Sequence, residues 1–206
     1  MTVVTNLSRR ERKKIASRER IVAEAIELFS RHGIAEVTVD QIAAAADIGK
    51  GTIYNYFETK EDIIVAFLVG FEPEVQDALA SLMRSQRPVS TILTEFITRQ
   101  FKMKEPYHAF VRVFLAQMLL RTQQFLPYMV EMQKTIDPPL EKLFTTLLQR
   151  GAIRTDVAIP ELVMVFKTIQ LGLTALWAVE GPPFKGTESV VKQEMMLFAK
   201  GLESRK

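Results

Sequence analysis

Several residue types that carry chemistry are absent or rare in this chain of 206 residues. It has no cysteine, so it can form neither a disulfide framework nor a thiolate metal site. Its two histidines, His32 and His108, have no partner that their spacing implies, and no glycine-rich loop suited to cradling phosphate is present. We therefore expect no enzyme activity and no metal or other cofactor.

Long apolar runs are also missing. The N-terminus lacks the continuous apolar stretch that a signal peptide needs. The apolar-rich region at residues 162–179 is interrupted by lysine, glutamine, threonine and glycine, which makes it too polar to assign as a membrane span. We expect a cytoplasmic protein with no membrane partner, and the lack of cysteine is compatible with a reducing compartment.

The period-two alternation of β-strands is nearly absent as well. Hydrophobic residues make up 48% of the chain, enough for a sizeable core. Glycine and proline divide the sequence into roughly nine helical segments. We therefore predict an all-α protein of two domains. Residues 1–60 would form a basic N-terminal arm and a three-helix helix-turn-helix domain, and residues 61–206 a larger helical domain for ligand binding and dimerisation.

Positive charge is concentrated near the N-terminus. The net charge is only +3, yet the first twenty residues include seven basic and two acidic ones. The basic arm, Arg9–Lys14, is expected to be a disordered, solvated tail, which can still add phosphate or minor-groove contacts to bound DNA. The first helix is predicted to begin at Ser17 and end at His32, with Gly33 as a left-handed cap.

Residues 38–57 combine two short helical patterns around a tight turn, which is typical of a helix-turn-helix. Thr38 is predicted to cap the second helix in a capping box with Gln41. The third helix, residues 50–57, would be about 12 Å long and would suit a major groove of about that width. Ile53 and Phe57 share one face of it and are expected to anchor it in the core.

The opposite face of the third helix carries groups that suit contact with DNA. They are Lys50, Gly51, Thr52, Asn55 and Tyr56. Asparagine can form two hydrogen bonds with adenine, and threonine or an aromatic edge can contact a thymine methyl group. Thr38 and Lys60, at the starts of the second and fourth helices, are expected to contact phosphates.

Six short motifs continue this pattern from the first helix into the fourth. They are Phe29-Ser-Arg-His-Gly33, Val37-Thr38, Ile42-Ala43, Lys50-Gly-Thr-Ile-Tyr54, Tyr56-Phe57 and Thr59-Lys60-Glu61. Here the chain resembles the TetR family of transcriptional regulators, over about residues 16–66. The resemblance implies DNA contacts by Thr38, Lys50, Gly51, Tyr54, Asn55, Tyr56 and Lys60. Gly49 departs from the family pattern and is a weaker N-cap for the recognition helix.

The second domain is rich in methionine and aromatic residues, which together can line an adaptable apolar cavity. We expect a small apolar or aromatic effector to bind there, although for any one such residue a place in the core is the commoner role. The candidate ligand-binding residues are Phe96, Met103, Phe110, Phe114, Met118, Met129, Phe166 and Trp177.

Two segments near the C-terminus have apolar residues at spacings of three and four, as in helices that pack along a partner. They carry Leu162, Phe166, Ile169, Leu173 and Leu176, and Val191, Met195, Phe198 and Leu202. Both helices from each of two chains would form a four-helix dimer interface, which the resemblance also implies. The alternative is that both helices are buried inside a monomer.

The predicted function is a sequence-specific DNA-binding transcriptional regulator, a homodimeric repressor that leaves a palindromic operator in double-stranded DNA when an effector binds. The resemblance implies that displacement of the fourth helix causes this release. Two other classes are alternatives. One is a helical adaptor that binds a protein through Tyr54, Asn55 and Tyr56, and the other is an enzyme that uses the helical cavity.

Overall fold

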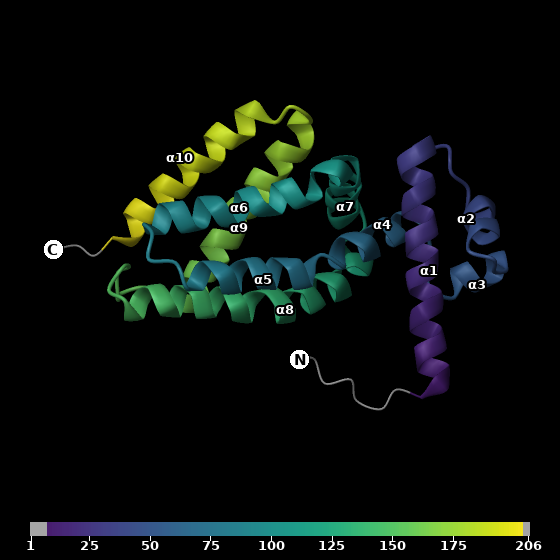
Figure 1. The fold of residues 1–206 in the computed structure, drawn as a ribbon, viewed down its shortest axis with the longest axis horizontal. Helices are drawn as coiled ribbons and strands as arrows, with labels where there is room; N and C mark the ends of the chain where they lie inside the picture. The colour runs from purple at the N-terminus through teal and green to yellow at the C-terminus, as the bar shows by residue number, and fades with distance from the viewer. Residues whose placement is uncertain (1–7, 204–206) are drawn as a thin grey trace. The chain divides into compact units, whose positions relative to one another are not determined.

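The computed structural model describes residues 8–203, apart from the side chains of six residues between positions 122 and 132. Within that range it has ten α-helices, one 3₁₀-helix and no strand (Figure 1), which confirms the predicted all-α fold. The chain divides into two compact units, one ending at Gly70 and one beginning at Phe71. This boundary lies ten residues beyond the expected one, because the fourth helix packs against the first.

The first unit contains four helices. They are α1 (Arg9–His32), α2 (Val39–Ala45), α3 (Lys50–Tyr54) and α4 (Lys60–Val69). Helix α1 packs against both α2 and α4, and α2 packs against α3. The buried side chains of α1 all lie in its second half, from Ile21 to Phe29. Ala43 of α2 and Ala46, which caps its C-terminal end, are buried and small, so neighbouring backbone can approach closely.

The start of α1 corrects the expectation of a disordered basic arm at Arg9–Lys14. These residues are helical, and the helix begins at Arg9 rather than Ser17. Ser8 and Glu11 form a capping box in which the Ser8 amide donates to Glu11 Oε2 (2.8 Å) and the Glu11 amide donates to Ser8 Oγ (3.2 Å). The Ser-x-x-Glu signal is visible in the sequence, so this helix start was predictable. Residues 1–7 of the arm lie outside the described residues.

The second unit contains six α-helices and the 3₁₀-helix. They are α5 (Glu72–Met83), α6 (Val89–Lys104), η1 (Glu105–Tyr107), α7 (His108–Leu120), α8 (Thr122–Gln149), α9 (Ile159–Glu180) and α10 (Lys185–Leu202). Helix α10 packs against α6 and α9, and α8 packs against α5 and α9 (Figure 1).

Helix α8 continues through Pro138 and Pro139, where the sequence predicts a break. Buried residues follow the two prolines on one face, including Leu140, Leu143 and Phe144. Since burying each such side chain contributes about 1.5–3 kcal/mol, packing outweighs the lost backbone hydrogen bonds. An ion pair between Asp137 and Lys167 (2.5 Å) also joins α8 to α9.

The core of the second unit is centred on aromatic rings. Phe96, Phe144 and Phe166 are fully buried, and Phe166 lies 6.0 Å from Phe96 and 5.8 Å from Phe144 between ring centroids. Helix α9 carries Phe166 and is long and apolar enough to cross a membrane by length and composition alone. A core helix meets the same criteria, and six residues of α9 are buried within the fold.

Candidate DNA-binding site

The helix-turn-helix begins with the predicted cap at Thr38. The Gln41 amide donates to Thr38 Oγ1 (3.3 Å), and the Thr38 amide donates to Gln41 Oε1 (2.8 Å), so the capping box is confirmed. The turn between α2 and α3 is closed by a hydrogen bond from the Ile48 amide to the Ala43 carbonyl (3.0 Å). Asp47 adopts a left-handed conformation in this turn, with φ of 50°, which aspartate tolerates better than most residues.

Helix α3 is shorter than predicted, with five residues rather than the eight expected. Gly49 is its N-cap and makes no side-chain capping bond, as expected for glycine. Asn55 caps its C-terminal end, and the helix is followed by a turn whose Tyr56 and Phe57 amides both donate to the Ile53 carbonyl (2.9 Å each). The α-helix ends at Tyr54 because the Asn55 and Tyr56 amides donate to carbonyls three residues back, those of Thr52 and Ile53, rather than four.

The two faces of α3 differ as the sequence predicts. Ile53 and Phe57 are buried, with 1% and 3% of their surface exposed. The candidate DNA contacts divide into two groups: Thr38, Lys50, Gly51, Tyr54 and Asn55 are exposed, and Thr52 and Tyr56 are half-buried. Tyr54 exposes half of its surface, 50%, which is unusual for a large ring and suits contact with a second molecule.

Lys50 forms an ion pair with Asp40 across the helix-turn-helix. The distance from Lys50 Nζ to Asp40 Oδ2 is 2.7 Å, and both side chains are largely exposed. The hydrogen bond to Asp40 raises the pKa of Lys50. Such an exposed pair contributes little to stability, so Lys50 can exchange this carboxylate for a phosphate or a guanine edge at small cost.

Lys60 has a different environment from the one expected for a phosphate contact. Its ammonium donates to three backbone carbonyls, those of Ile34 (2.5 Å), Ala35 (3.1 Å) and Val37 (3.0 Å). An ammonium has three N–H donors, so its hydrogen-bonding capacity is filled within the protein. A direct phosphate contact would require at least one of these bonds to break.

Two arginines of α1 also hold the helix-turn-helix, and sequence reasoning treated them only as charges. The Arg20 guanidinium donates to the Asp47 carbonyl (3.1 Å) in the turn before α3. The Arg18 guanidinium lies over the ring of Phe57, 5.3 Å from its centroid, in a cation–π contact. The sequence carries no signal for the Arg20 contact, because its acceptor is a main-chain carbonyl of the kind that every residue has.

The candidate ligand-binding residues occupy several environments in the second unit. Phe96, Phe110, Phe166 and Trp177 are buried, Met103, Phe114 and Met118 are half-buried, and Met129 is exposed. Phe96 and Phe166 belong to one aromatic cluster. Trp177 belongs to another and stacks between Phe101 (5.0 Å) and Phe184 (4.8 Å). The structure therefore does not bring these residues into a single group: Phe96 and Phe166 lie in the main core, and Met129 lies at the surface.

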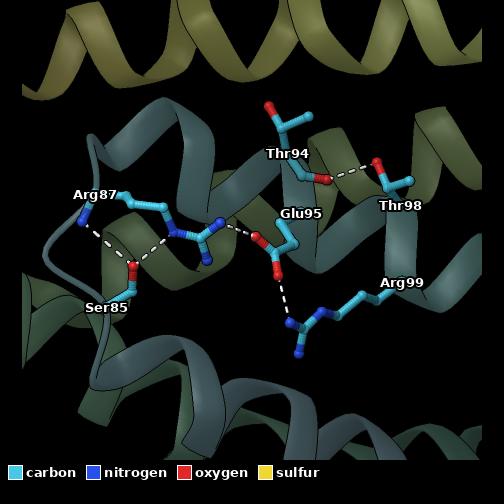
Figure 2. A network of polar contacts seen from close by, with 6 residues as sticks. All are labelled: Ser85, Arg87, Thr94, Glu95, Thr98 and Arg99. Atoms are coloured by element: carbon cyan, nitrogen blue, oxygen red, sulfur yellow. Dashed lines mark hydrogen bonds and ion pairs between the residues drawn. The ribbon is translucent and has the colours of Figure 1, made fainter.

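A surface groove of about 440 Å³ runs between α6 and α10, and none of the predicted ligand residues lines it. Figure 2 shows the polar network at its α6 side, where Glu95 lies between Arg87 and Arg99 and forms ion pairs with both. The hydrogen bond from Arg87, together with the positive charge of Arg99, lowers the pKa of Glu95. Among the described residues, no group of three histidine, aspartate or glutamate side chains could hold a metal ion.

The predicted dimer-interface residues are placed mostly inside the fold, which corrects that expectation. Six of them are buried and two, Ile169 and Phe198, are half-buried and packed against the core. The six are Leu162, Phe166, Leu173, Val191, Met195 and Leu202. Only Leu176 is exposed, at 54%. The three-and-four spacing therefore marks the faces of α9 and α10 that pack within the chain.

The opposite face of α9 is also apolar and is exposed, and α10 exposes two large apolar side chains among polar ones. Their large hydrophobic residues are Met164, Val165, Leu171, Leu176 and Val179 on α9, and Met196 and Leu197 on α10. We call this set the outer apolar face. It is unusual for one helix pair to expose so many large apolar side chains, and such a surface is typical of an interaction site.

Comparison with known proteins agrees with this geometry. The family model described as bacterial regulatory proteins, tetR family, matches residues 21–67, which span the second half of α1 through most of α4. Over nearly the whole chain, the protein is 22% identical to the HTH-type transcriptional regulator YhgD of Bacillus subtilis, covering 94% of this chain and 98% of that one. It is 23% identical to the HTH-type transcriptional repressor KstR2 of Rhodococcus jostii, covering 93% of each.

The fold is similar to that of a solved repressor. The crystal structure of Thermus thermophilus FadR, a TetR-family repressor in complex with lauroyl-CoA, matches with a TM-score of 0.74 and 19% identity, covering 92% of this chain and 96% of that chain. Its likeness extends over both units. From the helix-turn-helix, the matched family model and these relatives together, we conclude that the chain belongs to the TetR family of DNA-binding transcriptional regulators.

Proposed function

We propose that the protein is a homodimeric repressor in the cytoplasm, which binds a palindromic operator and leaves it when a small apolar effector enters the second unit. The observation that supports a homodimer is the outer apolar face of α9 and α10. A second copy is the occupant that this face fits, because a two-fold axis would set two apolar helix pairs against each other in a four-helix interface.

Two-fold symmetry has a direct consequence for DNA. A dimer with one helix-turn-helix per chain reads two half-sites of opposite orientation, so its operator should be palindromic. Repression is supported by the relative KstR2 of Rhodococcus jostii, which is named as a transcriptional repressor. Binding of the dimer at a promoter would block transcription by occupying the DNA.

The effector class is proposed from the interior of the second unit. Its half-buried residues Met103, Phe114 and Met118 have flexible or aromatic side chains that can repack around an apolar molecule. The Thermus thermophilus FadR of similar fold was solved with lauroyl-CoA, whose acyl chain is apolar. The release step would then pass through α4, which is the last helix of the DNA-reading unit.

Selection of bound sequences from a random duplex library tests this proposal. With the purified full chain, we expect a palindromic consensus whose half-sites lie about one helical turn or slightly more apart. A consensus consisting of a single half-site would contradict the dimer. Absence of enrichment would favour the alternative of a helical adaptor, which would use the same exposed surface for a protein partner.

Asn55 is predicted to help set the sequence preference. It is exposed at the C-terminal end of α3, and an asparagine amide pairs with adenine through two hydrogen bonds. Replacing Asn55 with alanine should weaken the binding free energy for the preferred base by about 1–3 kcal/mol at one base pair, and so relax the sequence preference at that position. The selection repeated with this variant measures the change. An unaltered consensus would mean that Asn55 does not contact a base.

A further inference from the structure

Lys60 occupies a position that its own helix does not favour. It is the first residue of α4, where the helix dipole is positive and acidic residues such as the following Glu61 and Asp62 are preferred. A cation at this position is locally unfavourable by a small amount, which an interaction from outside the helix can offset. The three carbonyls around its ammonium supply that interaction.

The three acceptors all come from one short segment. Ile34, Ala35 and Val37 lie between Gly33, which ends α1, and Thr38, which caps α2. Their carbonyls converge on a single atom, Lys60 Nζ, at distances of 2.5–3.1 Å. Hydrogen bonds to a charged donor are stronger than those between neutral groups, so this segment is held in one conformation. The residue at its end, Val37, is buried and directly precedes the Thr38 cap.

We infer that Lys60 is a positioning residue for DNA recognition rather than a phosphate contact. Its ammonium fixes the segment between α1 and α2, and thereby the position of α2 and α3. The start of α4 is thereby joined to the start of the helix-turn-helix by a direct polar link. Ile21, Phe29 and Ile53 are buried in the core of this unit, so we expect loss of the ammonium to leave α1 and that core in place. It would loosen the position from which α3 reaches the bases.

Salt dependence separates the two roles, because each phosphate contact contributes about 0.9 to the slope of log K against log salt. The experiment compares the full chain with Lys60→Met and with Lys60→Arg. Binding to the selected operator and to an unrelated duplex is measured between 50 and 200 mM salt. Lys50→Met is the matched control, since Lys50 is also a lysine of the helix-turn-helix region but is exposed beside Asp40. Circular dichroism checks that each variant is folded.

We expect Lys60→Met to lower operator affinity about tenfold or more, the equivalent of one hydrogen bond to a charged group, with a much smaller change on the unrelated duplex and the salt slope unchanged. Lys60→Arg should also lower the ratio of operator affinity to affinity for the unrelated duplex, but by a smaller factor. A planar guanidinium cannot place its donors toward three converging carbonyls. Lys50→Met should reduce the salt slope by about two, one phosphate contact for each protomer of the dimer.

Two results would overturn this inference. If Lys60→Met weakens binding to both duplexes equally and reduces the slope by about two, one for each protomer, Lys60 contacts a phosphate. Lys60→Arg would then retain full affinity, because arginine binds phosphate well. If both duplexes are weakened equally with an unchanged slope, Lys60 affects only the folded fraction. If the Lys60→Met protein is unfolded, the Lys60→Arg protein alone distinguishes the two roles. The measured quantity is then the ratio of its affinity for the operator to its affinity for the unrelated duplex.

Discussion

Replacing Leu176 with aspartate should convert the protein from dimers to monomers and lower operator affinity by about 10² to 10⁴ fold, the gain that joining two binding modules provides. Leu176 is 54% exposed on the outer apolar face, so the change should leave the fold of one chain intact. In the proposed dimer, the carboxylate would be buried against apolar side chains without a partner, which is costly. Light scattering measures the molar mass, and a binding titration measures the affinity.

A matched control is available on another helix. Leu120 is 79% exposed on α7 and is not one of the residues of the outer apolar face, so Leu120→Asp should stay dimeric. Substitution of Phe198 would be a poor test, because its ring packs 6.1 Å from Phe166 and 6.3 Å from Phe144 in the core. A Leu176→Asp protein that remains dimeric and binds the operator normally would remove the outer apolar face from the interface.

Operator affinity should fall by about 10³ to 10⁵ fold between 50 and 200 mM salt, if the dimer makes about 6 to 10 phosphate contacts. The steep dependence arises because each contact releases counterions from the DNA. The exposed basic residues at the start of α1 would supply part of it, since the helix presents them together. They are Arg9, Arg10, Arg12, Lys13 and Lys14. A titration at several salt concentrations measures the slope.

Replacing these five residues with glutamine should reduce that slope without changing the selected consensus, because phosphate contacts carry no direct sequence information. The control is Lys142→Gln, which changes an exposed lysine of α8 in the second unit and should leave the slope unaltered. An affinity that is nearly independent of salt for the unmodified chain would contradict DNA binding through phosphates. It would agree instead with an adaptor that holds a protein by apolar contacts.

The DNA-reading unit was largely predictable because its signals are local. The Thr38 capping box, the buried pair of Ile53 and Phe57, and the weak Gly49 cap all depend on residues within a few positions of one another. Such neighbours contact each other whenever the helix forms, so a pattern of spacing is sufficient to predict the structure. The helical start of α1 follows from the same kind of signal at Ser8 and Glu11.

The second unit shows where local signals are insufficient. Helix α9 is apolar on both its inner and its outer face. The sequence pattern therefore does not indicate which of the two faces packs within its own chain. The three-and-four spacing is satisfied by the inner face, and the contacts of α9 with α6, α7, α8 and α10 decide that this face packs within the chain. Likewise α8 passes through Pro138 and Pro139 because the residues that follow are buried by other helices.

By itself, the sequence determined the all-helical class, the helix-turn-helix and the surface of α3 that faces outward, since these depend on residues near one another along the chain. The tertiary structure alone decided which face of α9 and α10 is free for a partner, and what the Lys60 ammonium binds. Lys60 contacts carbonyls that are 23 to 26 residues away. Because every residue has such a carbonyl, the choice of acceptor depends only on where the fold brings the backbone.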